Sequence, residues 1–102
     1  MQTRFSKEQL MSIRQQAALY QCACPAQVGL LLAEILKLFE YQENCLNRTE
    51  ADVLVHRAIE KATLEAYPIV EKCLTEVLTL EGWNMDTLTM PEYLKQRLLD
   101  SI

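Results

Sequence analysis

The feature that most constrains the fold is an apolar series between residues 51 and 80, which recurs at helical spacing and passes through a proline. Because a turn at Pro68 would normally reset the phase of such a series, we predict one long helix from Glu50 to about Leu80, kinked at Pro68. Two helices separated at Tyr67–Pro68 are the alternative. We expect the series to form the buried face: Ala51, Val55, Ala58, Ala62, Ala66, Ile69, Cys73, Val77 and Leu80.

The ends of this long helix carry recognisable capping residues. Thr49 is the expected N-cap, with Asp52 three residues later in a position to return a hydrogen bond. Gly82 is suited to the left-handed residue that ends a helix, and Trp83 follows where a Schellman motif places its apolar contact. Both signals agree with a helix that spans the whole apolar series.

Two helices are predicted before it. The first opens with the capping box Ser6–Gln9 and runs to about Tyr20 or Gln21. The second opens at Pro25, a favoured first helical residue, with Cys24 as its N-cap. Leu36 and Leu38 flank the apolar stripe that we expect this second helix to bury: Val28, Leu31, Leu32, Ile35, Phe39, Gln42 and Leu46.

A short last helix is predicted to open at Thr89 through a second capping box, Thr89 to Glu92. Its expected buried face consists of Leu94, Leu98 and Ile102. The preceding segment 83–88 reads as a loop, and Trp83 there is either a protein-binding residue or a helix-end contact.

These elements predict an all-α fold. Only 2 glycines and 3 prolines occur in 102 residues, and half of the chain is hydrophobic, which suits one helical domain with one core. Short connections favour antiparallel neighbours. We therefore expect a single domain over residues 1–102, an antiparallel up-down bundle of three main helices with a short C-terminal helix.

The net charge of the chain indicates which classes of partner it can bind. The net charge is −4, and no expected helix carries the basic stripe that nucleic acid or an anionic membrane surface requires. No secretory signal is visible at the start, so we expect a cytoplasmic protein with reduced cysteines. No nucleic-acid partner and no membrane partner is predicted.

The Cys22-Ala23-Cys24 pair is the main candidate for chemistry, because thiols at a helix start favour redox reactivity and soft-metal binding. Cys45 lies at the far end of the second helix and cannot share a metal with them. Because the long helix runs back along the second helix, it places Cys73 at about the same height along the bundle as Cys22 and Cys24. A soft-metal site of Cys22, Cys24 and Cys73 is therefore one hypothesis, and two structural thiols at a corner is the other.

The remaining patterns favour a protein without enzymatic activity. The single histidine, His56, is expected near the opposite end from Cys22 and Cys24, and 2 glycines cannot form a phosphate-binding loop. We expect no cofactor. The strongly apolar second helix and the alanines of the long helix predict protein–protein contacts in a homodimer. Its interface candidates are Leu30, Leu38 and Tyr41.

Overall fold

The computed structural model describes residues 1–19 and 23–100, and within these the regular structure is entirely helical. The elements in chain order are α1 (Lys7–Leu19), α2 (Ala23–Asn44), α3 (Glu50–Glu81) and α4 (Glu92–Asp100). A single isolated bridge pairs Asn84 with Thr89 in the described residues. The predicted all-α fold with three main helices is confirmed.

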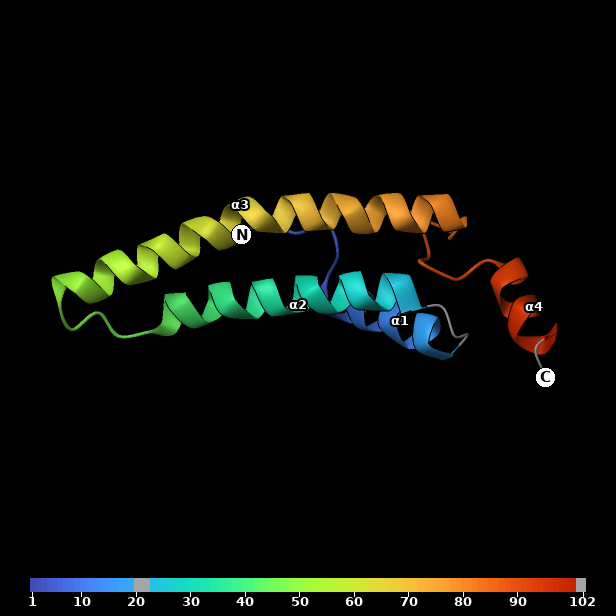
Figure 1. Ribbon diagram of the computed structural model, residues 1–102, viewed down its shortest axis with the longest axis horizontal. Helices are drawn as coiled ribbons and strands as arrows, with labels where there is room; N and C mark the ends of the chain where they lie inside the picture. The colour runs from blue at the N-terminus through green and yellow to red at the C-terminus, as the bar shows by residue number, and fades with distance from the viewer. Residues whose placement is uncertain (20–22, 101–102) are drawn as a thin grey trace.

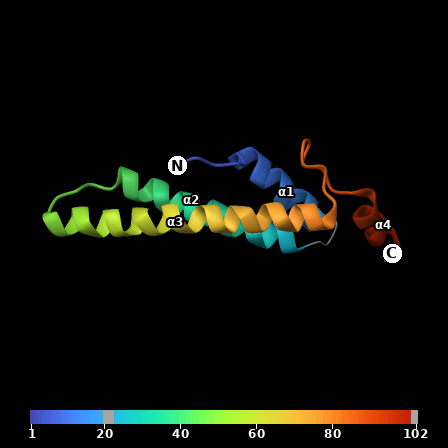
Figure 2. The same ribbon diagram turned by 90° about the horizontal axis from the view of Figure 1, so that it is seen from above.

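α2 and α3 form an antiparallel hairpin, and α1 packs on one face of this hairpin. α2 and α3 run side by side in opposite directions, as Figure 1 shows, and α1 packs on α2. Seen from above in Figure 2, α1 lies on one side of the α2/α3 pair, and α4 lies beyond the end of the hairpin. The molecule is elongated, with extents of 59 × 22 × 17 Å.

α3 is one continuous helix of 32 residues that contains Pro68, and Figure 1 shows it bending near its middle. Thr49 and Asp52 form the capping box that the sequence predicts, with Asp52 N–H donating to Thr49 Oγ1 at 3.1 Å. Gly82 (φ 84°) ends the helix, and Trp83 N–H donates to the Leu78 carbonyl at 3.0 Å. The proline therefore leaves the helix unbroken.

The capping box predicted for the start of α1 is confirmed, whereas the predicted start of α2 is not. Ser6 and Gln9 form both hydrogen bonds of the predicted capping box. α2 begins at Ala23, two residues before Pro25, so the assignment of Cys24 as an N-cap was wrong. Pro25 is tolerated inside the first turn, because the N–H groups there have no intrahelical acceptor. The predicted end of the first helix at residues 20–21 lies outside the described residues.

The core is concentrated where α1 covers the hairpin. Its residues come from the segment before α1, from the three main helices, from the segment after α3, and from α4: Phe5, Leu10, Ile13, Ala17, Leu32, Tyr67, Leu74, Leu78, Trp83, Leu88, Met90 and Leu94. On α2, the predicted burial of Leu32, Phe39 and Gln42 is confirmed, whereas Leu31 and Leu46 are exposed. Leu46 lies beyond the end of α2, where no helix covers it.

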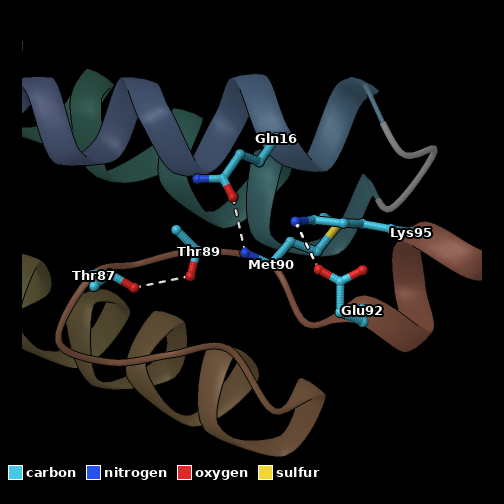
Figure 3. Close-up of polar contacts among 6 residues, drawn as sticks. All are labelled: Gln16, Thr87, Thr89, Met90, Glu92 and Lys95. Atoms are coloured by element: carbon cyan, nitrogen blue, oxygen red, sulfur yellow. Dashed lines mark hydrogen bonds and ion pairs between the residues drawn. The ribbon is translucent and has the colours of Figure 1, made fainter.

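Gln16 of α1 fixes the segment between α3 and α4. Its side-chain amide donates to the Leu88 carbonyl at 2.8 Å and accepts from Met90 N–H at 2.8 Å, the latter contact drawn in Figure 3. Asn84 closes the turn by accepting from Asp86 N–H and Thr87 N–H. This segment is therefore held in place both by hydrogen bonds within the turn and by hydrogen bonds to α1.

The predicted start of the last helix was wrong. α4 begins at Glu92, and Thr89 precedes it in a bridge to Asn84. The Thr89 hydroxyl pairs with the Thr87 hydroxyl at 2.8 Å, and the Glu92 carboxylate binds Lys95, so neither side chain forms the expected capping box (Figure 3). Leu94 is buried as expected, whereas Leu98 and Ile102 lie outside the residues whose side chains the structure describes.

Trp83 packs in the core and does not form a binding patch. It is 4% exposed, and its indole N–H donates to the Glu81 carboxylate at 2.8 Å. Met90 is equally buried. Of the two interpretations of Trp83, the structure therefore supports the helix-end contact and not the protein-binding residue.

Candidate functional site

The apolar series from which α3 is predicted lies on the exposed side of that helix and not on its buried side. The residues of α3 that are buried are Thr63, Tyr67, Leu74 and Leu78. By contrast, Val55 is 54% exposed, Ile69 72% and Leu80 85%. The predicted burial of this series was wrong, although the helix it predicts is present.

α3 thus carries two apolar stripes on different sides. With 100° of rotation per residue, the centre of the exposed series lies about 130° around the helix from the buried residues. α2 occupies the buried side, since the α2/α3 pair makes the most extensive helix contact in the molecule. Ala66 and Val77, at the edge nearest α2, are half-buried, and the remaining members are exposed: Ala51, Val55, Ala58, Ala62, Ile69, Cys73 and Leu80.

α2 contributes exposed leucines to the same side of the hairpin. Leu31 is 49% exposed and Leu38 is 45% exposed, and they lie one heptad apart on one side of α2. The residues of α2 that contact α1, such as Leu36, lie about 150° around the helix from this pair. Leu31 and Leu38 therefore point away from α1, beside the exposed series of α3.

We call this surface the open face: the α2/α3 side opposite α1, formed by Leu31 and Leu38 of α2 and the exposed series of α3. Figure 2 shows that only one side of the hairpin is covered by α1. α1 has 13 residues and α3 has 32. At 1.5 Å per residue they span about 20 Å and about 48 Å, so α1 is too short to cover the hairpin along its length even on its own side.

The three interface residues expected from the sequence are all exposed, but they do not share one side. Leu38 belongs to the open face. Tyr41, 65% exposed, lines a shallow hollow at the end of α2 together with Cys45 and Leu46. Leu30, 39% exposed, lines a hollow between α1 and α2 with Met11.

The cysteines are distributed as follows. Cys24 lies exposed in the first turn of α2, and Cys73 lies exposed on the open face, so the expected core position of Cys73 was wrong. Cys45 is half-buried after the end of α2. Cys22 lies outside the described residues. Within residues 1–19 and 23–100, no group of three or more His, Cys, Asp or Glu side chains is arranged to hold a metal ion.

His56 has a local structural contact. Its Nδ1 lies 2.6 Å from Asn47 Oδ1, which ties the start of α3 to the connection from α2. The contact lies at the end of the hairpin remote from Cys24, which lies in the first turn of α2. The geometry therefore keeps His56 away from that thiol, as the sequence predicts.

Sequence reasoning missed a buried polar group in the core. Tyr67 is fully buried, and its hydroxyl has no hydrogen-bond partner. Burial raises the pKa of Tyr67 above its usual 10.0, and the Glu71 carboxylate raises it further. The residue precedes Pro68, and nothing in the local sequence distinguishes it from an exposed tyrosine.

Comparison with protein-family models, with curated proteins and with solved structures found no match to this chain. Among the described helices, none combines the length and apolar character needed to cross a membrane. A function must therefore be inferred from the surface itself.

Proposed function

We propose that this chain is a non-enzymatic helical protein that acts through protein–protein contacts, and that it forms a homodimer through the open face. The observation that carries the proposal is the exposure of a regular apolar stripe along α3, up to 85% at Leu80. Large contiguous apolar surfaces on a folded chain mark interaction sites.

The total surface supports a missing partner. The chain exposes 7025 Å², whereas a compact monomer of 11.8 kDa exposes about 5,900 Å². The excess is about 1,100 Å², and a specific interface of ordinary size buries about 800 Å² on each partner. The excess surface is therefore sufficient for one such interface.

The shape leads to the same inference. The radius of gyration is 16.9 Å, against about 13 Å for a compact domain of this length. Such an open shape leaves the hairpin with one covered side and one bare side. A second copy that packs on the bare side would form a four-helix bundle from the two α2/α3 pairs.

A second copy is favoured because the open face is self-complementary. On α2 it presents the large side chains of Leu31 and Leu38, and on α3 it presents the small side chains of Ala58 and Ala62. Counting back from the connection between α2 and α3 at equal rise places Leu31 at the level of about residue 63. A two-fold axis parallel to the hairpin would set the leucines of each copy against the alanines of the other, an isologous contact.

Charge-introducing variants test this proposal by sedimentation velocity. Leu38→Glu and Ile69→Glu place a carboxylate at an exposed position, so the fold of one chain is preserved while a dry interface is disrupted. Both variants are expected to sediment as monomers at concentrations where the wild type is a dimer.

The matched control is Leu30→Glu, the same substitution at an exposed leucine on the α1 side of α2. It is expected to leave the dimer intact. If Leu30→Glu dissociates the protein and Leu38→Glu does not, the dimer forms through the α1 side and the proposed face is wrong.

A second candidate function is thiol chemistry, redox or soft-metal binding, at Cys22 and Cys24. The observation that favours it is the exposure of Cys24 in the first turn of α2. Native mass spectrometry of protein purified under reducing conditions tests it, with copper or zinc expected at one ion per chain. A metal-free protein in which neither Cys22 nor Cys24 alkylates faster than Cys45 and Cys73 would show that the pair has only a structural role.

A further inference from the structure

A hollow with an apolar floor lies between α1 and α2, on the side of α2 that faces away from Leu38. Its volume is about 330 Å³, within the range of small-ligand sites. Leu10 and Met11 of α1 and Ala33 and Leu36 of α2 supply the apolar lining. Leu10 is 2% exposed, so the floor belongs to the core and does not depend on surface side chains alone.

Three cations surround this apolar floor, in a chain whose net charge is −4. Lys7 is paired with Glu40, with Nζ 3.1 Å from a carboxylate oxygen. Arg14 and Lys37 have no acidic partner among the residues that the structure describes. Two positive charges at the rim are therefore available to a ligand, while the one acidic residue of the lining is already neutralised.

Arg14 is positioned by a glycine in the middle of α2. A Cβ at Gly29 would lie 3.2 Å from Arg14 Cγ and 3.5 Å from Cδ, so the bare backbone leaves room for the arginine stem. Glycine inside a helix costs about 1 kcal/mol relative to alanine. Here it allows α1 to approach α2 closely and lays the stem of Arg14 across the helix pair.

We propose that this hollow binds a small amphipathic carboxylate, with its apolar chain on the floor and its carboxylate between Arg14 and Lys37. The apolar floor selects a hydrocarbon group, and the unpaired cations select the anion, since a guanidinium binds carboxylates through paired hydrogen bonds. This site is independent of the proposed dimer, because it lies on the side of α2 that faces α1.

Isothermal titration calorimetry with decanoate, below the concentration at which it forms micelles, tests the site. Decyltrimethylammonium, which has the same chain and the opposite charge, is the matched ligand control. Saturable binding of one decanoate per chain is expected, with no saturable binding of the cation. Equal binding of both ligands, or no saturable binding of decanoate, would overturn the proposal.

Protein variants test whether the positive charge at the rim contributes to binding in addition to the apolar cavity. Lys37→Glu is expected to weaken decanoate binding by up to about fivefold, since an exposed charge pair contributes up to about 1 kcal/mol. Lys72→Glu makes the same charge change on α3, outside the hollow, and is expected to bind as the wild type does. Wild-type affinity in Lys37→Glu would refute the assigned role of the rim.

Two further experiments test whether the bound anion is a free carboxylate or a lipid surface, and whether the hollow depends on the dimer. Co-sedimentation with phosphatidylglycerol vesicles, without binding of free decanoate, would assign the cations to a lipid surface and overturn the proposed ligand. Leu38→Glu is expected to bind decanoate normally even if it is monomeric. Loss of binding in that variant would show that the hollow depends on the dimer.

Discussion

The hydroxyl of Tyr67 gives the sharpest test of how the core is assembled. The side chain is fully buried between α3 and its neighbours, and its oxygen has no hydrogen-bond partner. Leaving a buried polar group unsatisfied costs about 1–3 kcal/mol. Replacing the tyrosine by phenylalanine removes that cost and leaves a void of one oxygen atom, which costs only about 0.3 kcal/mol. We therefore expect Tyr67→Phe to raise the free energy of unfolding by about 0.7–2.7 kcal/mol.

Urea denaturation followed by far-ultraviolet circular dichroism measures this change. The melting temperature should rise by about 4–8 °C for each kcal/mol gained in a domain of this size. Tyr41→Phe, at a tyrosine that is 65% exposed, is the matched control and should change stability by less than about 0.5 kcal/mol. A loss of 1 kcal/mol or more in Tyr67→Phe would show that the hydroxyl has a partner in the core, and the reasoning would be refuted.

The same residue makes a pH prediction whose sign follows from its raised pKa. Below pH 10 the phenol is neutral in both the folded and the unfolded chain. Above pH 10 the unfolded chain loses the proton while the folded chain retains it, so wild-type stability falls as pH rises toward the folded-state pKa. The advantage of Tyr67→Phe over the wild type should therefore grow above pH 10, and a constant difference would contradict the burial of this group.

Three further changes test the helix ends and the exposed thiols. Thr49→Ala removes the acceptor for Asp52 N–H and should cost about 1 kcal/mol in chemical denaturation, a loss that an unchanged midpoint would rule out. Gly82→Ala places a side chain at φ 84°, where glycine is favoured, and should cost about 1 kcal/mol in thermal melts; equal stability would mean that the helix end relaxes. Cys73 is exposed in a single chain and lies on the open face, so it should alkylate faster in the monomeric Leu38→Glu variant than in the wild-type dimer, as peptide mass mapping would reveal; equal rates would contradict its place in the dimer interface.

The helices were predictable because their signals are local. The capping boxes at Ser6 and Thr49 and the glycine at position 82 mark helix ends by hydrogen bonds that are confined to a few neighbouring residues. The continuity of α3 past Pro68 followed from the phase of the apolar series. These features depend on the chain within one or two turns, and the sequence contains that information.

The buried side of α3 was not predictable from the same pattern. The helix has two apolar stripes, and the more regular one, which includes Val55 and Ile69, is exposed. The buried one contains Thr63 and Tyr67, whose polar atoms make it look less like a core. Which stripe α2 covers is decided by the connection between the helices and by the position of α1, and neither is a property of α3 alone.

The cation-rimmed hollow could not have been found from spacing either. Arg14 and Lys37 belong to different helices, and each looks like an ordinary surface residue in its own segment. Only the crossing of α1 over Gly29 brings them to the same cavity. The failed capping box at Thr89 has a similar cause, because the hydrogen bonds of Gln16 and Asn84 draw this segment into a turn.

The central claim is that the open face is covered by a second copy of the chain. Light scattering of the wild-type protein across a concentration series measures the mass directly. The account predicts a particle of twice the 11.8 kDa chain mass at micromolar concentration, dissociating on dilution. A particle of 11.8 kDa at every concentration up to the millimolar range would contradict it.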